Sequence, residues 1–234
     1  MSHRGAHPED PRLFGAAVLP RLRAACEELS WLLGRDYRLE PALRAVSEHH
    51  QLDARQRLAV QRSACSPGQQ AERLRRSLTP EQATGAAWAI DGFNLIITLE
   101  VALSGGVLLR GRDGALRDLA GLRGSYHLID ETTAALALLG EAVRRHRPTR
   151  LQLWLDAPVA NSGRLRSRIA EHAAAWPVAP EIELVPDADR DLCGRSGVVS
   201  SDSVVLDACA TWLSLASWLV GEHVPSAWIV DLGA

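Results

Sequence analysis

The sequence predicts an α/β fold, in which a mostly parallel β-sheet is flanked by helices and preceded by a small all-α N-terminal region. Short apolar runs bounded by glycine and proline recur after residue 86, and such runs are typical of the buried strands of a parallel sheet. Helical segments of about ten or more residues separate most of these runs, as β-α-β crossovers require. We therefore expect a helical region over residues 1–80 and an α/β domain over residues 81–234.

Apolar residues at helical spacing predict the elements of the first region. This spacing runs from Leu13 to Leu33, and Gly34 is placed to end that helix. Asp53 is placed as the N-cap of a later helix that is rich in Gln and Arg. The predicted helices cover residues 13–33, 39–46, 54 to about 65, and 71–78. Three short helices with tight turns fit a helix-turn-helix-like module, and they fit equally a small bundle that packs on the second domain.

The second region alternates between strand and helix signals. The predicted strands cover residues 86–90, 151–155, 181–185, 197–199 and 226–230. The predicted helices cover residues 94–103, 131–146, 162–175 and 203–219. A hairpin is expected between residues 107–110 and 115–118, because Gly-Arg-Asp-Gly at 111–114 is a turn sequence.

Charge is distributed unevenly along the chain. All 26 basic residues are Arg; residues 1–80 hold 13 of them against 9 acidic residues, whereas residues 81–234 hold 13 against 19. A basic first region suits contact with nucleic acid, and an acidic second region suits a metal site. Solvated helix faces also explain the excess of Arg in the first region.

Missing motifs narrow the range of functions. The chain has no C-x-x-C, H-E-x-x-H, G-x-G-x-x-G, Walker A or G-x-S-x-G sequence, which disfavours zinc ribbons, dinucleotide binding, nucleoside-triphosphate chemistry and α/β-hydrolase chemistry. We expect the four cysteines to be reduced and buried, the tryptophans to lie in the core, and the adjacent His49 and His50 to point to different faces of a helix. No run is long enough to span a bilayer and no signal-peptide pattern is present, so we expect a cytoplasmic protein without a membrane partner.

Three apolar runs end on an aspartate in the same way. Asp91, Asp156 and Asp202 each follow a predicted strand and precede a small polar turn. Ligands of open α/β sheets bind outside the carboxyl ends of the strands, so these carboxylates are expected at one edge of the sheet. Carboxylate oxygens are the ligands that hard divalent cations prefer. The sequence therefore predicts a site for Mg²⁺ or Mn²⁺, while the helix caps that strand-end aspartates often form are the structural alternative.

Other polar residues near these strand ends are candidates for supporting roles. Asp207 lies five residues after Asp202 and is a further potential metal ligand. The predicted substrate-positioning residues are Asn94, Asp118, Ser162, Ser200 and Ser203.

The same motifs resemble the PIN-like superfamily, in particular its NYN branch of metal-dependent ribonucleases. The motifs are Asp-Gly-Phe-Asn at 91–94, a central strand ending at Asp156, and Ser-Asp-Ser at 201–203, and the likeness covers about residues 86–234. The wider arrangement is similar to an uncharacterised archaeal and bacterial family in which a helical region with a Gln-Arg-rich helix precedes a PIN-like region. The resemblance implies that Asp91, Asp156 and Asp202 are catalytic metal ligands and that RNA is the substrate.

The late motif departs from the NYN pattern at one position. NYN nucleases typically carry a second acid two residues after the aspartate of this motif, where the chain has Val204. The site would then hold one metal instead of two, recruit Asp207, or bind RNA or a nucleotide without cutting it. Arg112, Arg117 and Arg164 are the predicted contacts to an RNA backbone. A homodimer and a small phosphorylated ligand are alternatives that the sequence leaves open.

Overall fold

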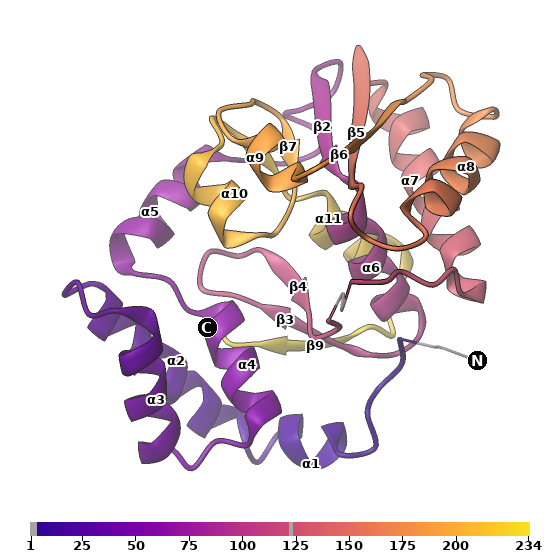
Figure 1. Cartoon of the computed structure of the whole chain (residues 1–234). Helices are drawn as coiled ribbons and strands as arrows, with labels where there is room; N and C mark the ends of the chain where they lie inside the picture. Colours follow the sequence, from indigo (N-terminus) through magenta and orange to yellow (C-terminus); the bar gives the residue numbers. More distant parts are fainter. Residues whose placement is uncertain (1–3, 122–123) are drawn as a thin grey trace.

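The computed structural model describes residues 4–121 and 124–234 and shows the α/β fold with a helical N-terminal region that the sequence predicts (Figure 1). The helices are α1 (Asp10–Phe14), α2 (Leu19–Leu33), α3 (Leu39–His49), α4 (Ala54–Ser63), α5 (Pro67–Arg76), α6 (Gly92–Leu103), α7 (Asp130–His146), α8 (Ser162–Ala173), α9 (Ala188–Leu192), α10 (Ser203–Ala208) and α11 (Leu215–His223). The strands are β1 (Ser77–Leu78), β2 (Ala87–Asp91), β3 (Val107–Arg110), β4 (Leu116–Asp118), β5 (Arg150–Asp156), β6 (Glu181–Val185), β7 (Val198–Val199), β8 (Trp212–Leu213) and β9 (Trp228–Asp231).

The main sheet has six parallel strands in the order β1-β8-β7-β2-β5-β6. Side chains alternate between its two faces: Trp88 and Ile90 belong to the core built with α6, α7, α8 and α11, whereas Ala89 and Trp154 belong to a core built with α9 and α10. Strand β2 pairs with β5 on one side and with β7 on the other. The carboxyl ends of these three strands therefore lie side by side at one edge of the sheet.

Helix α6 starts directly at the end of β2 and is buried on every side, as a helix held between packed layers must be. A Cβ on its first residue, Gly92, would lie 2.6 Å from Leu155 Cδ2 and 3.0 Å from Trp154 O. Glycine is therefore required at this position by the close approach of α6 to β5. This contact is the physical reason for the glycine of the Asp-Gly-Phe-Asn motif.

A second sheet, of order β4-β3-β9, joins the helical region to the rest of the molecule. Strands β3 and β4 form the predicted hairpin, and β9 runs parallel to β3. Val107 and Val230 of this sheet share a core with Leu29 of α2 and Val60 of α4. The N-terminal helices are thus a small bundle that packs on the α/β part, and β1, which follows α5 directly, extends the edge of the main sheet.

The structure corrects the helix predicted over residues 203–219, which is wrong as a single element. The segment forms α10, the short strand β8 and α11. Trp212 pairs with Ser77 and with Val198, so partners far away in sequence override the local helical spacing. The helix predicted over residues 71–78 begins earlier, because Pro67 occupies its first turn and Ser66 caps it. The short helix α9 was not predicted.

Two expectations about buried residues are also wrong in part. Cys26, Cys65 and Cys209 are free and buried, but Cys193 is exposed. Trp88 and Trp154 are buried in the core, whereas Trp31 is 52% exposed. Across the described residues, no helix has the length and apolar character that a membrane crossing needs.

Candidate functional site

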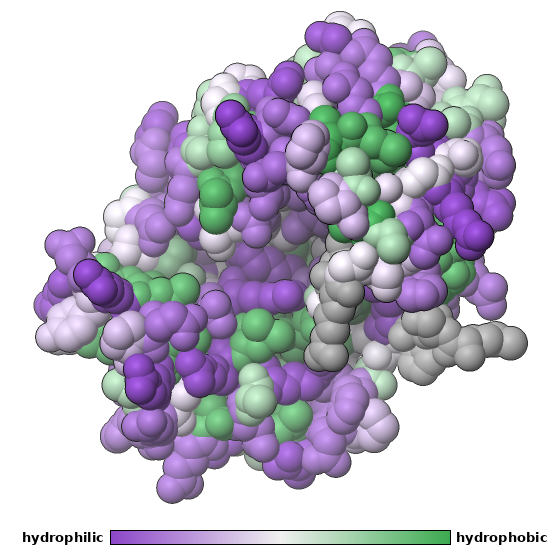
Figure 2. Space-filling view, viewed as in Figure 1, coloured by the Kyte–Doolittle hydropathy of each residue, from purple (hydrophilic) through white to green (hydrophobic). Residues whose placement is uncertain are grey.

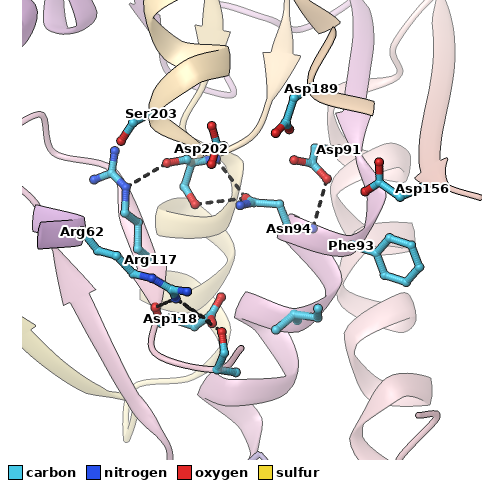
Figure 3. Close-up of a pocket in the computed structure, with 13 residues that line it drawn as sticks. Arg62, Asp91, Phe93, Asn94, Arg117, Asp118, Asp156, Asp189, Asp202 and Ser203 are labelled. Carbon is cyan, nitrogen blue, oxygen red and sulfur yellow. Dashed lines mark hydrogen bonds and ion pairs between the residues drawn. The ribbon is translucent and has the colours of Figure 1, made fainter. Parts of the chain in front are cut away.

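A cavity of about 480 Å³ opens at the carboxyl edge of the main sheet, where Figure 2 shows hydrophilic residues gathered in a hollow. The three predicted aspartates face it together: Asp91 ends β2, Asp156 ends β5, and Asp202 caps α10 just after β7 (Figure 3). Among the described residues, the lining comprises Arg62, Asp91, Phe93, Asn94, Ile97, Arg117, Asp118, Ala120, Asp156, Asp189, Ser201, Asp202 and Ser203. The parallel topology therefore brings carboxylates that lie 111 residues apart in the chain into one site.

Asp91 is the most deeply buried of these carboxylates, with a relative exposure of 5%. Its Oδ1 accepts a hydrogen bond from the backbone N–H of Asn94 at 3.1 Å, and its Oδ2 accepts one from Ser200 Oγ at 3.0 Å. Burial raises the pKa of Asp91 to about 7, and the nearby carboxylates of Asp189 and Asp156 raise it further against the lowering effect of the two hydrogen bonds. In the absence of a cation, the protein thus holds this group at the border between its protonated and ionised forms.

Asp156 and Asp202 each use one oxygen to organise the chain. Asp156 Oδ1 accepts from the backbone N–H of Ala188 at 2.9 Å and thereby fixes the start of α9. Asp202 Oδ1 accepts from the backbone N–H of Val204 at 2.7 Å and caps α10. Both residues therefore combine the capping role with a position on the cavity wall.

Asp189 is a carboxylate at the cavity, beside the three strand-end aspartates, that the sequence reasoning missed. It lies on α9 at the carboxyl end of β6, and Figure 3 shows it just above Asp91. Burial raises its pKa to about 6, with further contributions from Asp202, Asp156 and the neighbouring Asp187. The signal in the sequence was the Pro-Asp-Ala-Asp stretch at 186–189, which follows a strand just as the other site motifs do.

Asn94 and Ser200, both predicted as positioning residues, tie the late loop to the start of α6. Asn94 Oδ1 accepts from the backbone N–H of Ser201 at 2.9 Å and from its Oγ at 3.0 Å. Ser200 Oγ, which donates to Asp91, also accepts from the backbone N–H of Asp202 at 3.1 Å. The two residues therefore set the distance between the first and the third aspartate. Asn94 and Ser203 line the cavity, whereas Ser200 and Ser162 lie outside the lining.

Asp118 and Arg117 form the opposite wall, where the helical region contributes Arg62. Asp118 Oδ2 accepts from Thr98 Oγ1 at 3.1 Å, and burial raises the pKa of Asp118. Arg62 Nη1 donates to the backbone oxygens of Asp118 at 2.5 Å and Ala120 at 3.3 Å. Arg117 donates to both carboxylate oxygens of Asp113, at 2.8 and 2.6 Å. Its charge is therefore already paired inside the protein.

The remaining predicted site residues lie outside the cavity lining. Asp207 accepts from Arg73 Nε at 2.7 Å and from Gln69 Nε2 at 2.8 Å, so its carboxylate belongs to the contact between α5 and α10. Arg112 lies in the hairpin turn, and Arg164 is exposed on α8. The structure does not bring these three residues together with the strand-end aspartates.

The electrostatic character of the cavity is strongly acidic. Among the described residues, no Arg or His forms an ion pair with Asp91, Asp156, Asp189 or Asp202. The carboxylate oxygens of these aspartates are spread around the cavity wall. Among the described residues, the three potential ligand atoms that lie within 4.8 Å of one another belong to Glu28, His49 and His50, not to the aspartates. Grouped carboxylates without a counterion favour the binding of a cation.

Comparison with known proteins matches both parts of the chain. A family model described as Protein of unknown function (DUF434) matches residues 21–76, and one described as Domain of unknown function (DUF5616) matches residues 80–218. An uncharacterized protein of Methanocaldococcus jannaschii is 29% identical over 185 residues, which make up 79% of this chain and 88% of that relative. No solved structure matches the chain. Because the second model covers more than half of its residues, the chain belongs to the family described as Domain of unknown function (DUF5616).

Proposed function

We propose that the protein is a metal-dependent endoribonuclease of the PIN-like superfamily, similar to its NYN branch, that acts on RNA in the cytoplasm. One observation carries the proposal: Asp91, Asp156 and Asp202 face a single cavity at the carboxyl edge of a parallel sheet. The residue types, their positions at strand ends and their lack of a paired cation among the described residues all suit a hard divalent ion.

The buried state of Asp91 is the observation that tests whether the cavity fits such an ion. Its carboxylate is almost fully buried, and both of its oxygens already accept a hydrogen bond. Burial and two neighbouring carboxylates nevertheless keep its pKa near 7, which means that positive charge at this place would be favourable. Asp91, Asp156, Asp189 and Asp202 are the residues that would hold Mg²⁺ or Mn²⁺.

The chemistry of phosphodiester hydrolysis assigns roles to the groups around the cavity. A divalent cation bound there would lower the pKa of a bound water and neutralise charge on the phosphate. Ser200 and Asn94 hold the first and third aspartates in a fixed relation, so that the carboxylates need little rearrangement. Arg62 lines the cavity beside Asp118, with which it forms an ion pair at 3.5 Å, and its side chain is 32% exposed, which leaves part of it accessible to an RNA phosphate.

The NYN resemblance leads us to expect an acidic residue at position 204, where the chain has Val204, and Asp189 is the candidate to replace it. Val204 is 64% exposed and lies outside the cavity lining. Asp189 reaches the cavity from a different element, α9, and adds a carboxylate to those of the three strand-end aspartates. We propose that Asp189 takes the place of the missing acid and that Asp207 does not.

The second candidate function is a non-catalytic module that binds RNA or a nucleotide on the same fold. The valine at position 204 favours it, since the acid expected there is absent from the late motif. This alternative predicts salt-sensitive RNA binding that survives Asp91→Asn, with no cleavage under any metal.

An RNA cleavage assay separates the two candidates. Wild type and the Asp91→Asn, Asp202→Asn double variant are incubated with a mixture of structured and single-stranded RNA in Mn²⁺, with a parallel arm in EDTA. Asp36→Asn is the matched control, because Asp36 is exposed and has a φ of 62° that asparagine adopts readily. We expect cleavage by wild type and by Asp36→Asn in Mn²⁺ only. Equal cleavage by the double variant would indicate contamination and would refute the enzyme proposal.

A further inference from the structure

Glu28, His49 and His50 form a second cluster of potential ligands, in the helical region. Among the described residues it is the group of three whose ligand atoms all lie within 4.8 Å of one another. Glu28 lies on α2, His49 is the last residue of α3, and His50 is the C-cap of α3. None of these residues contributes to the acidic cavity at the main sheet.

The end of α3 explains why two adjacent histidines converge, against the expectation from sequence. Consecutive side chains of a continuous helix point about 100° apart. At His50 the backbone leaves the helix, with φ −86° and ψ 1°, and the two rings meet edge to face with centroids 4.8 Å apart. His50 Nε2 also lies 2.8 Å from Glu28 Oε2, which connects the pair of rings to α2.

The helices that carry these residues are held firmly against each other. Leu29, which follows Glu28, and Val46, one turn before His50, are buried in the same core. The cluster therefore rests on two packed helices and not on a loop, which reduces the entropy that ligand binding would cost.

We propose that Glu28, His49 and His50 bind a borderline transition-metal ion of the Zn²⁺ type. Two imidazole nitrogens and one carboxylate oxygen form a common ligand set for Zn²⁺, whereas Mg²⁺ and Mn²⁺ prefer oxygen ligands alone. Zn–ligand bonds of about 2.1 Å place tetrahedral ligand atoms about 3.4 Å apart. The observed spread of up to 4.8 Å is thus closed by small side-chain rotations.

An ion pair between His50 and Glu28 alone does not account for the cluster, because it does not explain why a ligand atom of His49 also lies within 4.8 Å of the other two. Three protein ligands also leave the fourth position of a tetrahedral ion open. Glu28 borders a surface cavity of about 450 Å³ whose other lining residues are Glu27, Trp31 and Leu32. A metal held by these three side chains would cross-link α2 to the end of α3.

Titration with Zn²⁺ and with Co²⁺ tests this proposal in the full chain. The Asp91→Asn, Asp202→Asn protein serves as the background, so that the acidic cavity does not contribute to the signal. Calorimetry gives the stoichiometry, and Co²⁺ reports geometry because tetrahedral Co²⁺ absorbs visible light far more strongly than octahedral Co²⁺. We expect one ion per chain, a strong visible band, and a melting temperature raised by about 5 °C at metal concentrations far above Kd.

Three variants decide the outcome. His49→Ala, His50→Ala should lose the visible band and the thermal shift, and Glu28→Gln should weaken binding at least tenfold while keeping the fold. His127→Ala is the matched control, because His127 is exposed and lies outside the cluster. Unchanged binding in the double histidine variant would overturn the proposal, as would binding that saturates only at large metal excess, which would show an adventitious ion only. Each of these results is independent of RNA cleavage.

Discussion

Replacing Asp91 by asparagine should stabilise the metal-free protein at neutral and alkaline pH. Burial and the carboxylates of Asp189 and Asp156 raise the pKa of Asp91 from 3.8 to about 7. The folded protein therefore retains this proton to a higher pH than the unfolded chain does. The stability contributed by Asp91 is complete below about pH 4, decreases as the pH rises, and is lost above about pH 7.

The magnitude follows from the size of the shift. About three pKa units correspond to about 4 kcal/mol at 1.36 kcal/mol per unit. Water in the open cavity reduces this cost, so we expect Asp91→Asn to raise the free energy of unfolding by about 1–3 kcal/mol at pH 8 and to change it little at pH 4. Asparagine can keep both hydrogen bonds, because its oxygen accepts from Asn94 N–H and its amide donates to Ser200 Oγ.

Urea unfolding in EDTA, followed by circular dichroism at several pH values, measures this effect. The difference between Asp91→Asn and wild type should grow from pH 4 to pH 8, while Asp36→Asn stays with wild type. A variant that is equally stable or less stable than wild type at pH 8 would refute the view that Asp91 carries an unfavourable buried charge. Asp189, whose pKa is raised to about 6, should leave a smaller pH dependence in the variant.

Three further substitutions test other parts of the structure, each by urea unfolding. Arg73→Ala removes a side chain that is 2% exposed and pairs with two carboxylates, so it should lower the free energy of unfolding by about 3–5 kcal/mol. Arg75→Ala, on the same helix, removes an exposed ion pair and should leave the protein as stable as wild type. Gly140→Ala places a Cβ 2.4 Å from the indole nitrogen of Trp176 and should lower the free energy of unfolding by about 1–3 kcal/mol. Gly163→Ala is its control: the added Cβ meets no atom within 4 Å and should stabilise the helix by up to about 1 kcal/mol. Arg62→Ala loses its bonds to two backbone oxygens and should cost about 1–2 kcal/mol; no measurable change would mean that the helical region does not brace the cavity wall.

The fold could be predicted where local pattern and tertiary structure agree. Strand β5 and helices α6 and α7 are long apolar or amphipathic segments, and the structure places them within two residues of the expected ranges. The segment 203–219 failed because a strand of two residues has almost no local signal. Trp212 is extended only because β7 and the distant Ser77 supply hydrogen-bond partners on both sides. Such a strand is decided by tertiary pairing and not by spacing along the chain.

The site could be predicted as far as topology alone determines it. The sequence places Asp91, Asp156 and Asp202 at strand ends, and parallel pairing then brings them to one edge. Asp189 also follows a strand, in Pro-Asp-Ala-Asp at 186–189, but the sequence does not show which aspartate of that stretch reaches the cavity. In the structure, the backbone N–H of Ala188 on α9 donates to Asp156, and this contact anchors the helix that carries Asp189. Asp207 follows Asp202 closely in sequence, yet its carboxylate pairs with Arg73 from the helical region.

The central claim is that the strand-end aspartates form one divalent-cation site, and equilibrium binding of Mn²⁺ tests it most directly. Electron paramagnetic resonance counts free and bound Mn²⁺ in wild type, in the Asp91→Asn, Asp202→Asn variant and in the His49→Ala, His50→Ala variant. The account predicts saturable binding in wild type, its loss in the aspartate variant, and its retention in the histidine variant. Equal Mn²⁺ binding in wild type and the aspartate variant would contradict it.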